Sequence, residues 1–301
     1  MAMWHLTLLG APTDAGAGVA GAQLGPDALR GAGLARALRA QGHDVQDLGN
    51  LAGPPTPAHE ARHGPHHLAC VSAWNQAVHD AVAGILAAQR LPVLLGGDHS
   101  LAVGSISAVA RHCRQTGKAL CVLWLDAHAD ANTPATSPSG NLHGMPVACL
   151  LGDGPAALTA LAGGPPALQP AQLRLVGLRS VDAGEQCYLR QRGLPVWRMP
   201  EVRALGMAQT MAQVLRGIQA GTHHLHVSLD LDCIDPALAP GVSTPASDGI
   251  GHHAMQQCMD LLAASGAVGS VDLVELNPLR DQQGQTAQLA VDLLLRLAGS
   301  A

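Results

Sequence analysis

The sequence predicts an α/β fold: a three-layer αβα sandwich whose helices cover both faces of a mainly parallel central sheet. Two observations support this class. Short apolar runs of strand-like composition alternate along the chain with longer segments of helical periodicity, as a series of βαβ units requires. Hydrophobic residues make up 48% of the 301-residue chain, so the chain can bury a sizeable core.

Eight apolar runs are expected to be strands, and seven helical patterns lie among them. The strands are predicted at residues 5–9, 43–48, 92–95, 119–125, 172–178, 196–199, 224–229 and 270–276. The helices are predicted at residues 26–41, 68–89, 101–116, 182–192, 202–220, 252–264 and 285–297. Pro26 followed by Asp27 is typical of a helix start, because proline is tolerated there and an acid suits the helix dipole.

Proline and glycine mark the loops, which are predicted at residues 53–65, 134–144, 163–170 and 236–251. No internal repeat, long linker or shift in composition divides the chain. We therefore expect a single domain that covers residues 1–301.

Composition also restricts the class of protein. The formal net charge of −5 argues against a general nucleic-acid binder, which normally carries a basic surface. The seven cysteines are scattered and form no CxxC pair, which indicates reduced thiols. No secretory signal or membrane span is recognisable in the sequence. We expect a cytoplasmic protein that binds neither nucleic acid nor membranes.

Three polar segments directly follow predicted strands: residues 96–100 (GGDHS), 126–130 (DAHAD) and 230–236 (DLDCIDP). In an open parallel sheet, sites form outside the carboxyl ends of the strands, where all three segments are expected. Extended side chains alternate with period two, so acids and histidines at alternate positions point to one side. We therefore expect three neighbouring strands to bring four carboxylates and two imidazoles together.

So many acids in one place would repel one another, and removing each from water costs on the order of several kcal/mol. Divalent cations remove this problem, and six such ligands suit two ions roughly 3.5–4 Å apart. The dominance of carboxylates favours Mn²⁺ over structural zinc. A single Asp-His pair is more often a loop cap, so only the combination predicts metal binding. Asp98 is expected to orient the ligands, and Asp235 to brace a turn.

These segments resemble the signature motifs of the ureohydrolase superfamily. The long loop that begins with the second polar segment is similar to the corresponding loop of the arginase branch. This loop runs from residues 126–134 (DAHADANTP) through residues 137–146 (SPSGNLHGMP). Further similar segments are residues 25–30 (GPDALR), 177–185 (GLRSVDAGE) and 275–278 (ELNP). The resemblance spans essentially the whole chain. It implies an arginase/deacetylase-like fold and hydrolysis of L-arginine to L-ornithine and urea through a metal-bridging hydroxide.

The resemblance also implies which residues would hold two Mn²⁺ per subunit. Asp126 and Asp230 would bridge the two ions. The complete sets are His99, Asp126, Asp130 and Asp230 for one metal, and Asp126, His128, Asp230 and Asp232 for the other.

Five further positions correspond to substrate contacts in the family. The neutral donors Asn132, Ser139 and Asn141 would hold the substrate's α-carboxylate without adding a cation that repels the substrate. Asp182 would contact the α-amino group, and the hydroxyl of Thr244 would line the site.

Three acid–base or polar groups would take part in the reaction itself. Glu275 would hold the planar guanidinium with its two carboxylate oxygens. Asp130 would carry a proton to the leaving amine, and His143 would exchange protons with solvent. The resemblance further implies a homo-oligomer, either a trimer or a hexamer.

Two alternative functions stay open, and a third is set aside. A ureohydrolase for agmatine or guanidinobutyrate would share the metal ligands but not need the loop that holds the α-carboxylate. A metal-binding regulatory relative without turnover would seldom keep every chemical group intact. Residues 16–21 (GAGVAG) match the dinucleotide-binding pattern of an oxidoreductase. Residues 23–26 (QLGP) intervene before the next helix, so the phosphate site is missing, and a flexible loop near the site is expected instead.

The remaining histidines and Cys233 are assigned no function. Histidines clustered in Pro/Gly loops are usually solvated, whereas His226 alternates along a predicted strand as a core residue would. Cys233 is expected to be buried and structural. The histidines set aside in this way are His63, His66, His67, His223, His224, His226, His252 and His253.

Overall fold

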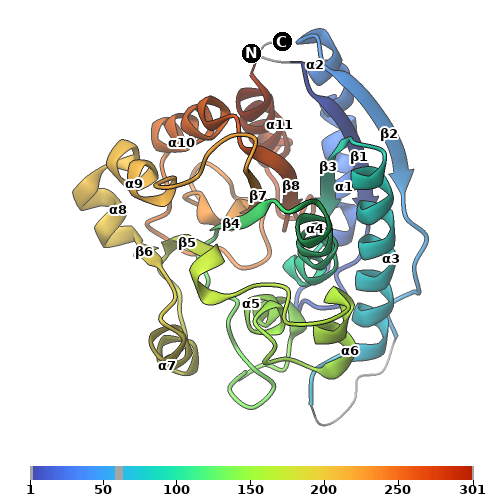
Figure 1. Cartoon of the computed structure of the whole chain (residues 1–301), viewed down its shortest axis with the longest axis vertical. Coiled ribbons are helices and arrows are strands. Elements are labelled where there is room, and N and C mark those ends of the chain that lie inside the picture. Colours follow the sequence, from blue (N-terminus) through green and yellow to red (C-terminus); the bar gives the residue numbers. More distant parts are fainter. Residues whose placement is uncertain (1–2, 58–63, 300–301) are drawn as a thin grey trace.

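A single eight-stranded sheet runs through the computed structural model of the protein, which describes residues 3–57 and 64–299 (Figure 1). The strand order is β2-β1-β3-β8-β7-β4-β5-β6, and all neighbouring strands are parallel. All eight predicted strands are present. Their bounds are β1 His5–Ala11, β2 Asp44–Asn50, β3 Leu91–Gly96, β4 Ala119–Leu125, β5 Leu173–Leu178, β6 Val196–Arg198, β7 His223–Asp230 and β8 Val268–Val274.

Helices cover both faces of this sheet. One face carries α1 (Gly25–Gly31), α2 (Leu34–Ala40), α8 (Met199–Leu205), α9 (Met207–Val214), α10 (His252–Ser265) and α11 (Gln285–Ala298). The other carries α3 (Leu68–Ala87), α4 (Ala102–Thr116), α5 (Pro146–Leu150), α6 (Ala156–Thr159) and α7 (Ala183–Arg192). Among the described residues, none of these helices could span a membrane.

The buried strand β4 shows how the sequence builds two cores. Cys121 and Leu123 pack with the helices of one face. Val122 and Trp124 lie in the hydrophobic cluster of the opposite face. A strand covered on both sides is apolar at every position, and this explains its continuous hydrophobic run. The three-layer αβα sandwich is therefore confirmed.

Several boundaries differ from the prediction because glycine ends helices that apolar periodicity alone would continue. The predicted helix at 26–41 is divided at Gly33, whose φ is 87°. The predicted helix at 202–220 starts earlier, is divided at Gly206 with φ 76°, and ends at Val214. Strand β8 ends at Val274, so Glu275 lies just beyond it. Part of the predicted loop at 53–65, residues 58–63, lies outside the described residues.

The strand order corrects one prediction about the site. The three polar segments follow β3, β4 and β7, but these are not three neighbouring strands, because β8 lies between β3 and β7. The contiguous set is β3-β8-β7-β4, and β8 adds Glu275 at the same edge. Strand order cannot be read from the alternation of elements, since crossovers of similar length connect near and distant strands.

Gly97 occupies the tightest point at this edge. Its N–H donates to the Ala11 carbonyl at 3.0 Å, and its own carbonyl accepts from the N–H of Glu275 at 2.8 Å. An added Cβ would lie 1.8 Å from the carbonyl oxygen of Thr13. Only glycine allows the chain segments after β1, β3 and β8 to approach this closely.

We expect Gly97→Ala to lower the free energy of unfolding by about 1–3 kcal/mol, because the added methyl group meets backbone that cannot move aside. The measurement is urea denaturation followed by circular dichroism. Gly164→Ala is the matched control, since among the described residues only its own chain neighbours lie within 4 Å of the added Cβ. A Gly97→Ala variant as stable as the control would show that the close approach is not needed.

Candidate metal centre and adjoining cavity

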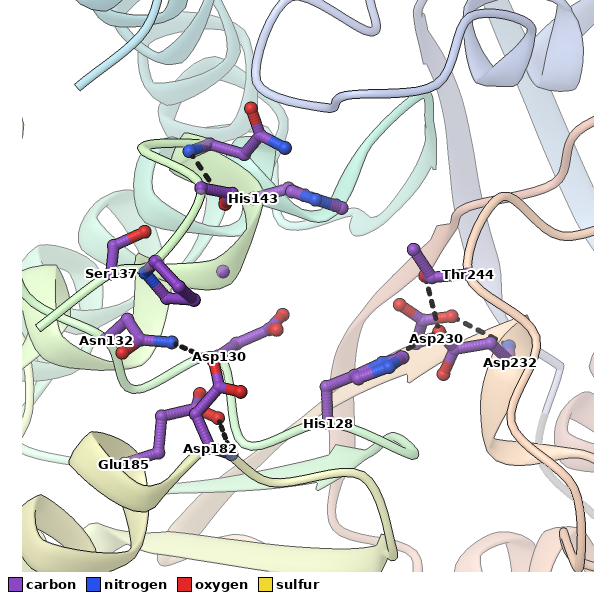
Figure 2. A pocket seen from close by; sticks show the side chains of 14 residues that line it. His128, Asp130, Asn132, Ser137, His143, Asp182, Glu185, Asp230, Asp232 and Thr244 are labelled. Carbon is purple, nitrogen blue, oxygen red and sulfur yellow. Dashed lines mark hydrogen bonds and ion pairs between the residues drawn. The ribbon is translucent and has the colours of Figure 1, made fainter.

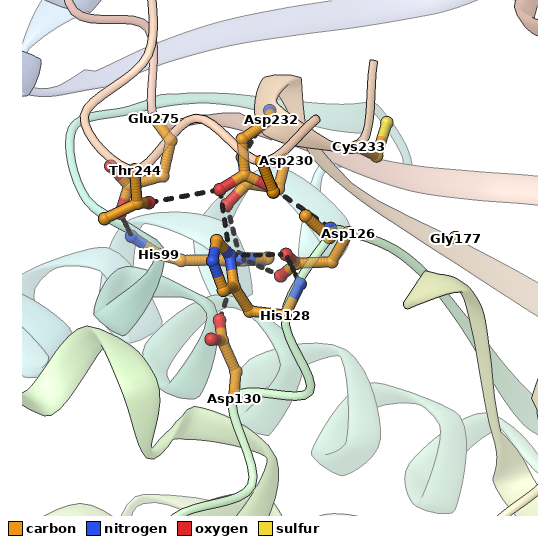
Figure 3. Close-up of polar contacts among 12 residues, drawn as sticks. His99, Asp126, His128, Asp130, Gly177, Asp230, Asp232, Cys233, Thr244 and Glu275 are labelled. Atoms are coloured by element: carbon orange, nitrogen blue, oxygen red, sulfur yellow. Dashed lines mark hydrogen bonds and ion pairs between the residues drawn. The ribbon is translucent and has the colours of Figure 1, made fainter. Parts of the chain in front are cut away.

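The predicted ligands meet at the carboxyl edge of the sheet (Figure 3). His99 opens a short 3-10 helix, η2 (His99–Leu101), that follows β3. Asp126 follows β4, and Asp230 is the last residue of β7. Asp232 lies in the next short helix, η6 (Leu231–Cys233). Each side chain is positioned by the end of a buried strand, as the sequence predicts.

Carboxylate oxygens surround the Nδ1 atom of His99. It lies 3.1 Å from Asp126 Oδ2, 3.2 Å from Asp130 Oδ2 and 3.1 Å from Asp230 Oδ2. One ring nitrogen has one proton or one lone pair, so it cannot satisfy three acceptors. Side chains that converge in this way on a common point are suited to coordinate a cation.

A second group of donors forms around His128. Its Nδ1 lies 3.0 Å from Asp232 Oδ2 and 3.5 Å from Asp126 Oδ1. The ligand atoms of His99, Asp126 and Asp230 lie within 4.8 Å of one another, and so do those of Asp126, His128 and Asp232. Asp126 is common to the two groups, as a bridging carboxylate would be.

Asp130 and Asp230 differ from Asp126 in their placement. Asp230 belongs to the group of His99 only, and its Oδ1 accepts the N–H of Asp232 at 2.7 Å. Asp130 contacts His99 but belongs to neither group. Its φ of 50° is an uncommon conformation for a residue with a side chain. That Asp230 is a second bridge, and that Asp130 is a ligand, stay predictions.

Further contacts fix the ligands and were not predicted. Trp124 Nε1 donates to Asp126 Oδ2 at 2.9 Å, and the indole stacks on the His99 ring with centroids 4.0 Å apart. The hydroxyl of Ser228 lies 2.8 Å from His99 Nε2. Trp124 precedes Asp126 by two residues, as Ser228 precedes Asp230, so period-two alternation could have identified both. Such contacts orient ligands and set the tautomer of a histidine.

Burial acts strongly on the four carboxylates. It raises the pKa of Asp230 well above the usual value, and the neighbouring Asp232 adds to this rise. Burial likewise raises the pKa of Asp130 to about 7. For Asp126, burial is outweighed by the His128 and His99 imidazoles, which hold its pKa below the usual range. Two imidazoles cannot neutralise four buried acids, so this donor set fits divalent cations.

A cavity of about 290 Å³ opens next to the centre (Figure 2). It includes most of the predicted substrate contacts and adds four residues that the sequence analysis did not select: Ser137, Pro138, Gly144 and Glu185. The full lining is His128, Asp130, Asn132, Ser137, Pro138, Ser139, Asn141, His143, Gly144, Asp182, Glu185, Asp230, Asp232 and Thr244.

Glu185 connects two walls of this cavity. Its Oε1 accepts the N–H of Ala131 at 3.0 Å, and its Oε2 accepts the N–H of Asp182 at 2.9 Å. Asp182 is the N-cap of α7 and receives a hydrogen bond of 3.1 Å from Asn132 Nδ2. The spacing Asp-x-x-Glu before a helix is a capping box, so the sequence held a signal for this contact.

His143 and Glu275 form an ion pair beside the centre. His143 Nδ1 lies 3.1 Å from Glu275 Oε1, which also accepts the N–H of His99 at 2.9 Å. Glu275 does not line the cavity, and its φ is 64°. Its Oε2 is buried and has no hydrogen-bond partner within the described ranges. An unpaired buried carboxylate oxygen is costly, and a cationic donor would remove that cost.

Asp98 and the glycine-rich loop lie on the same side of the site. Asp98 accepts the N–H of Ser100 at 2.9 Å and that of Gly16 at 2.8 Å, so it acts on backbone rather than on a ligand side chain. The carbonyl of Gly16 in turn accepts the N–H of His143 at 3.0 Å. The loop at 16–21 is thus near the site, as expected, and α1 begins only at Gly25.

Three residues outside the predicted ligand and substrate sets have structural roles. His226 is fully buried, with Nδ1 2.8 Å from Ser270 Oγ, so its core placement is confirmed. Cys233 is also buried, and this burial raises the pKa of its thiol. Asp235 braces its turn by accepting the N–H groups of Ala237 and Gly249, each at 3.0 Å. His63 lies outside the described residues.

Comparison with known proteins decides the family. The model of the arginase family matches residues 5–299. The chain belongs to the arginase family. It is 38% identical to the arginase of Bacillus caldovelox over 99% of both chains, and 39% identical to that of Brucella melitensis over 98% of this chain and 96% of the relative.

Solved arginase structures share the whole fold. The solved native structure of the Bacillus caldovelox arginase superposes with a TM-score of 0.94, at 38% identity and with 99% of each chain covered. An arginase from Entamoeba histolytica in complex with L-ornithine gives a TM-score of 0.89 at 29% identity, covering 99% of this chain and all of the other. The protein is therefore an arginase-type hydrolase with the arginase/deacetylase fold, and its His/Asp groups suggest a binuclear metal site.

Because Asp126 belongs to both donor groups, we expect Asp126→Ala to lose both metal ions and its activity to fall by on the order of 10³-fold. Bound metal is counted by mass spectrometry after gel filtration of metal-loaded protein. Asp292→Ala, an exposed acid on α11, is the control and retains the wild-type count. Two ions bound to the Asp126→Ala variant would contradict the bridging assignment.

The Glu275 charge should also govern the titration of His143. Burial lowers the pKa of His143, but the Glu275 carboxylate outweighs this effect and raises it to about 9. Glu275→Gln removes the charge, so we expect the pKa to fall toward or below its ordinary 6.5. The measurement is an NMR titration of the His143 ring in metal-free protein.

The same pair makes stability depend on pH. Since the folded-state pKa of His143 is raised, the ion pair contributes fully to the free energy of unfolding below pH 6.5. This contribution is lost as the pH rises through about 9. The Glu275→Gln variant should not show this loss of stability between pH 6.5 and about 9. A pKa of His143 that is the same in the variant and the wild type would rule out this role for Glu275.

Proposed function

We propose that this protein hydrolyses L-arginine to L-ornithine and urea, with two Mn²⁺ per subunit. One observation carries the proposal: metal donors such as His128 and Asp232 line the same cavity as the neutral donors Asn132, Ser139 and Asn141 (Figure 2). A ligand in this cavity can therefore place one end at the centre and the other on the loop.

Manganese is proposed from the chemistry of the donors. The candidate ligands are four carboxylates and two imidazoles, a set rich in hard oxygen atoms. Such a pair of ions, when bound, lowers the pKa of water and so supplies a nucleophile at neutral pH. The proposed sets are those named from the sequence, with Asp126 and Asp230 as bridges and with Asp130, His99, His128 and Asp232 completing them.

Glu275 is proposed to bind the guanidinium of the substrate. Its Oε1 already accepts from His99 and His143, so its buried Oε2 is the oxygen left for a cation. A guanidinium presents donors in a fixed plane and pairs well with a carboxylate. Thr244, whose hydroxyl donates to Asp232 Oδ2 at 3.2 Å, lines the cavity on the side of the centre.

The opposite end of the cavity suits an α-amino acid. Asp182 offers a carboxylate for an ammonium group, and in the free protein it holds Asn132 Nδ2 at 3.1 Å. The hydroxyl of Ser139 accepts the N–H of Asn141 at 3.2 Å, which leaves its own proton to donate. Neutral donors bind a carboxylate without repelling the cationic parts of the substrate.

Proton transfer is proposed for two residues of the cavity. Asp130 lies beside His99 at the centre and would pass a proton to the leaving amine. His143 is paired with Glu275, and 17% of its side chain is exposed, so it can exchange protons between the cavity and solvent.

Three further parts of the proposal have different support. Seven free cysteines, six of them buried, fit a reducing cytoplasm. One sheet between two helical layers fits a single domain over residues 1–301. A homo-oligomer, trimer or hexamer, is proposed from the family alone. Light scattering of the purified protein measures the mass of the assembly directly.

The deciding experiment is urea release by Mn²⁺-loaded protein from L-arginine, agmatine and 4-guanidinobutyrate. We expect kcat/KM for L-arginine to exceed the other two by on the order of 10⁴-fold, because both analogues leave polar groups of the cavity unpaired. Preference for agmatine or guanidinobutyrate would favour the alternative ureohydrolase. Two bound ions without urea from any of the three would favour the regulatory alternative.

A further inference from the structure

The loop that lines the cavity at residues 137–141 is held by a segment remote in sequence. Within the loop, Ser137 Oγ accepts the N–H of Gly140 at 3.0 Å. From outside, His66, which precedes α3, donates its N–H to the carbonyl of Gly140 at 2.9 Å. The packing is close, because a Cβ on Gly140 would lie 3.0 Å from His66 Nε2. The sequence analysis assigned His66 no function.

His66 also contacts the side chain of Asn141. Its Nδ1 lies 3.2 Å from Asn141 Oδ1, across a separation of 75 residues. An amide oxygen only accepts, so the ring nitrogen is the donor in this contact. The two amide protons of Asn141 are therefore on the other end of the group, at Nδ2.

The glycine-rich loop restricts Asn141 from the opposite side. A Cβ on Gly18 would lie 2.6 Å from Asn141 Nδ2, so a side chain there would displace the amide from this position. Asn141 is thus held between His66 and Gly18 while it lines the cavity. A free amide can turn either end toward a ligand, and the carbonyl end would repel a carboxylate.

We propose that His66 is a specificity-positioning residue: it fixes the amide of Asn141 so that its N–H end, and not its oxygen, is available to the α-carboxylate of the substrate. This inference rests on the proposed function. His66 does not itself line the cavity, so it acts through Asn141. The metal donors are untouched, so the effect is confined to ligands that carry the carboxylate.

The test compares L-arginine with agmatine, which lacks the carboxylate, in Mn²⁺-loaded protein. We expect His66→Ala to raise KM for L-arginine about three- to tenfold, the effect of one net hydrogen bond, with kcat within about twofold. The kcat/KM for agmatine should not change. If His66 had a merely structural role, its loss would lower kcat/KM for both substrates alike. The ratio of kcat/KM for L-arginine to that for agmatine therefore identifies the positioning role.

Two variants sharpen this test. In His66→Asn, the side-chain amide places an N–H donor near the position of Nδ1 and should restore KM to within about twofold of the wild type. In an Asn141→Ala background, His66→Ala should raise KM no further, because the two residues act as one unit. His253→Ala, an exposed histidine on α10, is the matched control with unchanged kinetics.

Binding without turnover separates this inference from the proposed function. Calorimetry compares L-ornithine with 1,4-diaminobutane, which lacks the carboxylate. Failure of the wild type to bind L-ornithine would overturn both proposals. Wild-type binding of L-ornithine that His66→Ala leaves unchanged would overturn only the positioning role, as would an equal loss for both ligands. A selective loss for L-ornithine, restored by His66→Asn, supports it.

Discussion

Four buried aspartates at one edge of the sheet, Asp126, Asp130, Asp230 and Asp232, set the constraint on which the rest of the site depends. Like charges that lie this close together and are buried from water are tolerated only when groups of opposite charge or hydrogen-bond donors compensate them. The protein supplies imidazole rings, an indole donor and backbone N–H groups, and these leave a deficit of positive charge. A scaffold that holds acids against their repulsion must be stiff, and a parallel sheet buried on both faces meets that need.

Placing the acids at this edge is accompanied by local backbone strain next to the rigid sheet. Asp130 and Glu275 both have positive φ, at 50° and 64°, although neither is glycine. Glu275 directly follows β8, and Asp130 lies five residues beyond the end of β4, so packing at this edge holds both residues in a conformation that they rarely adopt. Gly97 leaves the space that the Glu275 segment needs, since its carbonyl accepts the N–H of Glu275. The strained positions coincide with the two residues to which proton transfer and guanidinium binding are proposed.

The sequence predicted what depends on short-range patterns. Alternating elements gave the αβα class, and polar residues directly after apolar runs gave the ligand segments. Contacts between distant segments were not accessible in this way. Alternation along β7 marks Ser228 as a neighbour of Asp230, but it does not indicate that the hydroxyl contacts His99, which is 129 residues away. No local pattern indicates that His66 contacts Asn141. Strand order was equally hidden, so the place of β8 between β3 and β7 was missed.

The two ends of the cavity rest on different supports. Ligands such as Asp126 follow the strands and are held by residues of the sheet such as Trp124. Asn141, in contrast, is held by His66 and by the glycine-rich loop, and neither belongs to the sheet. Changes in the loop contacts can therefore alter which end groups are accepted without displacing the ligands. Recognition of the substrate and the chemistry at the centre are in this sense separable parts of one cavity.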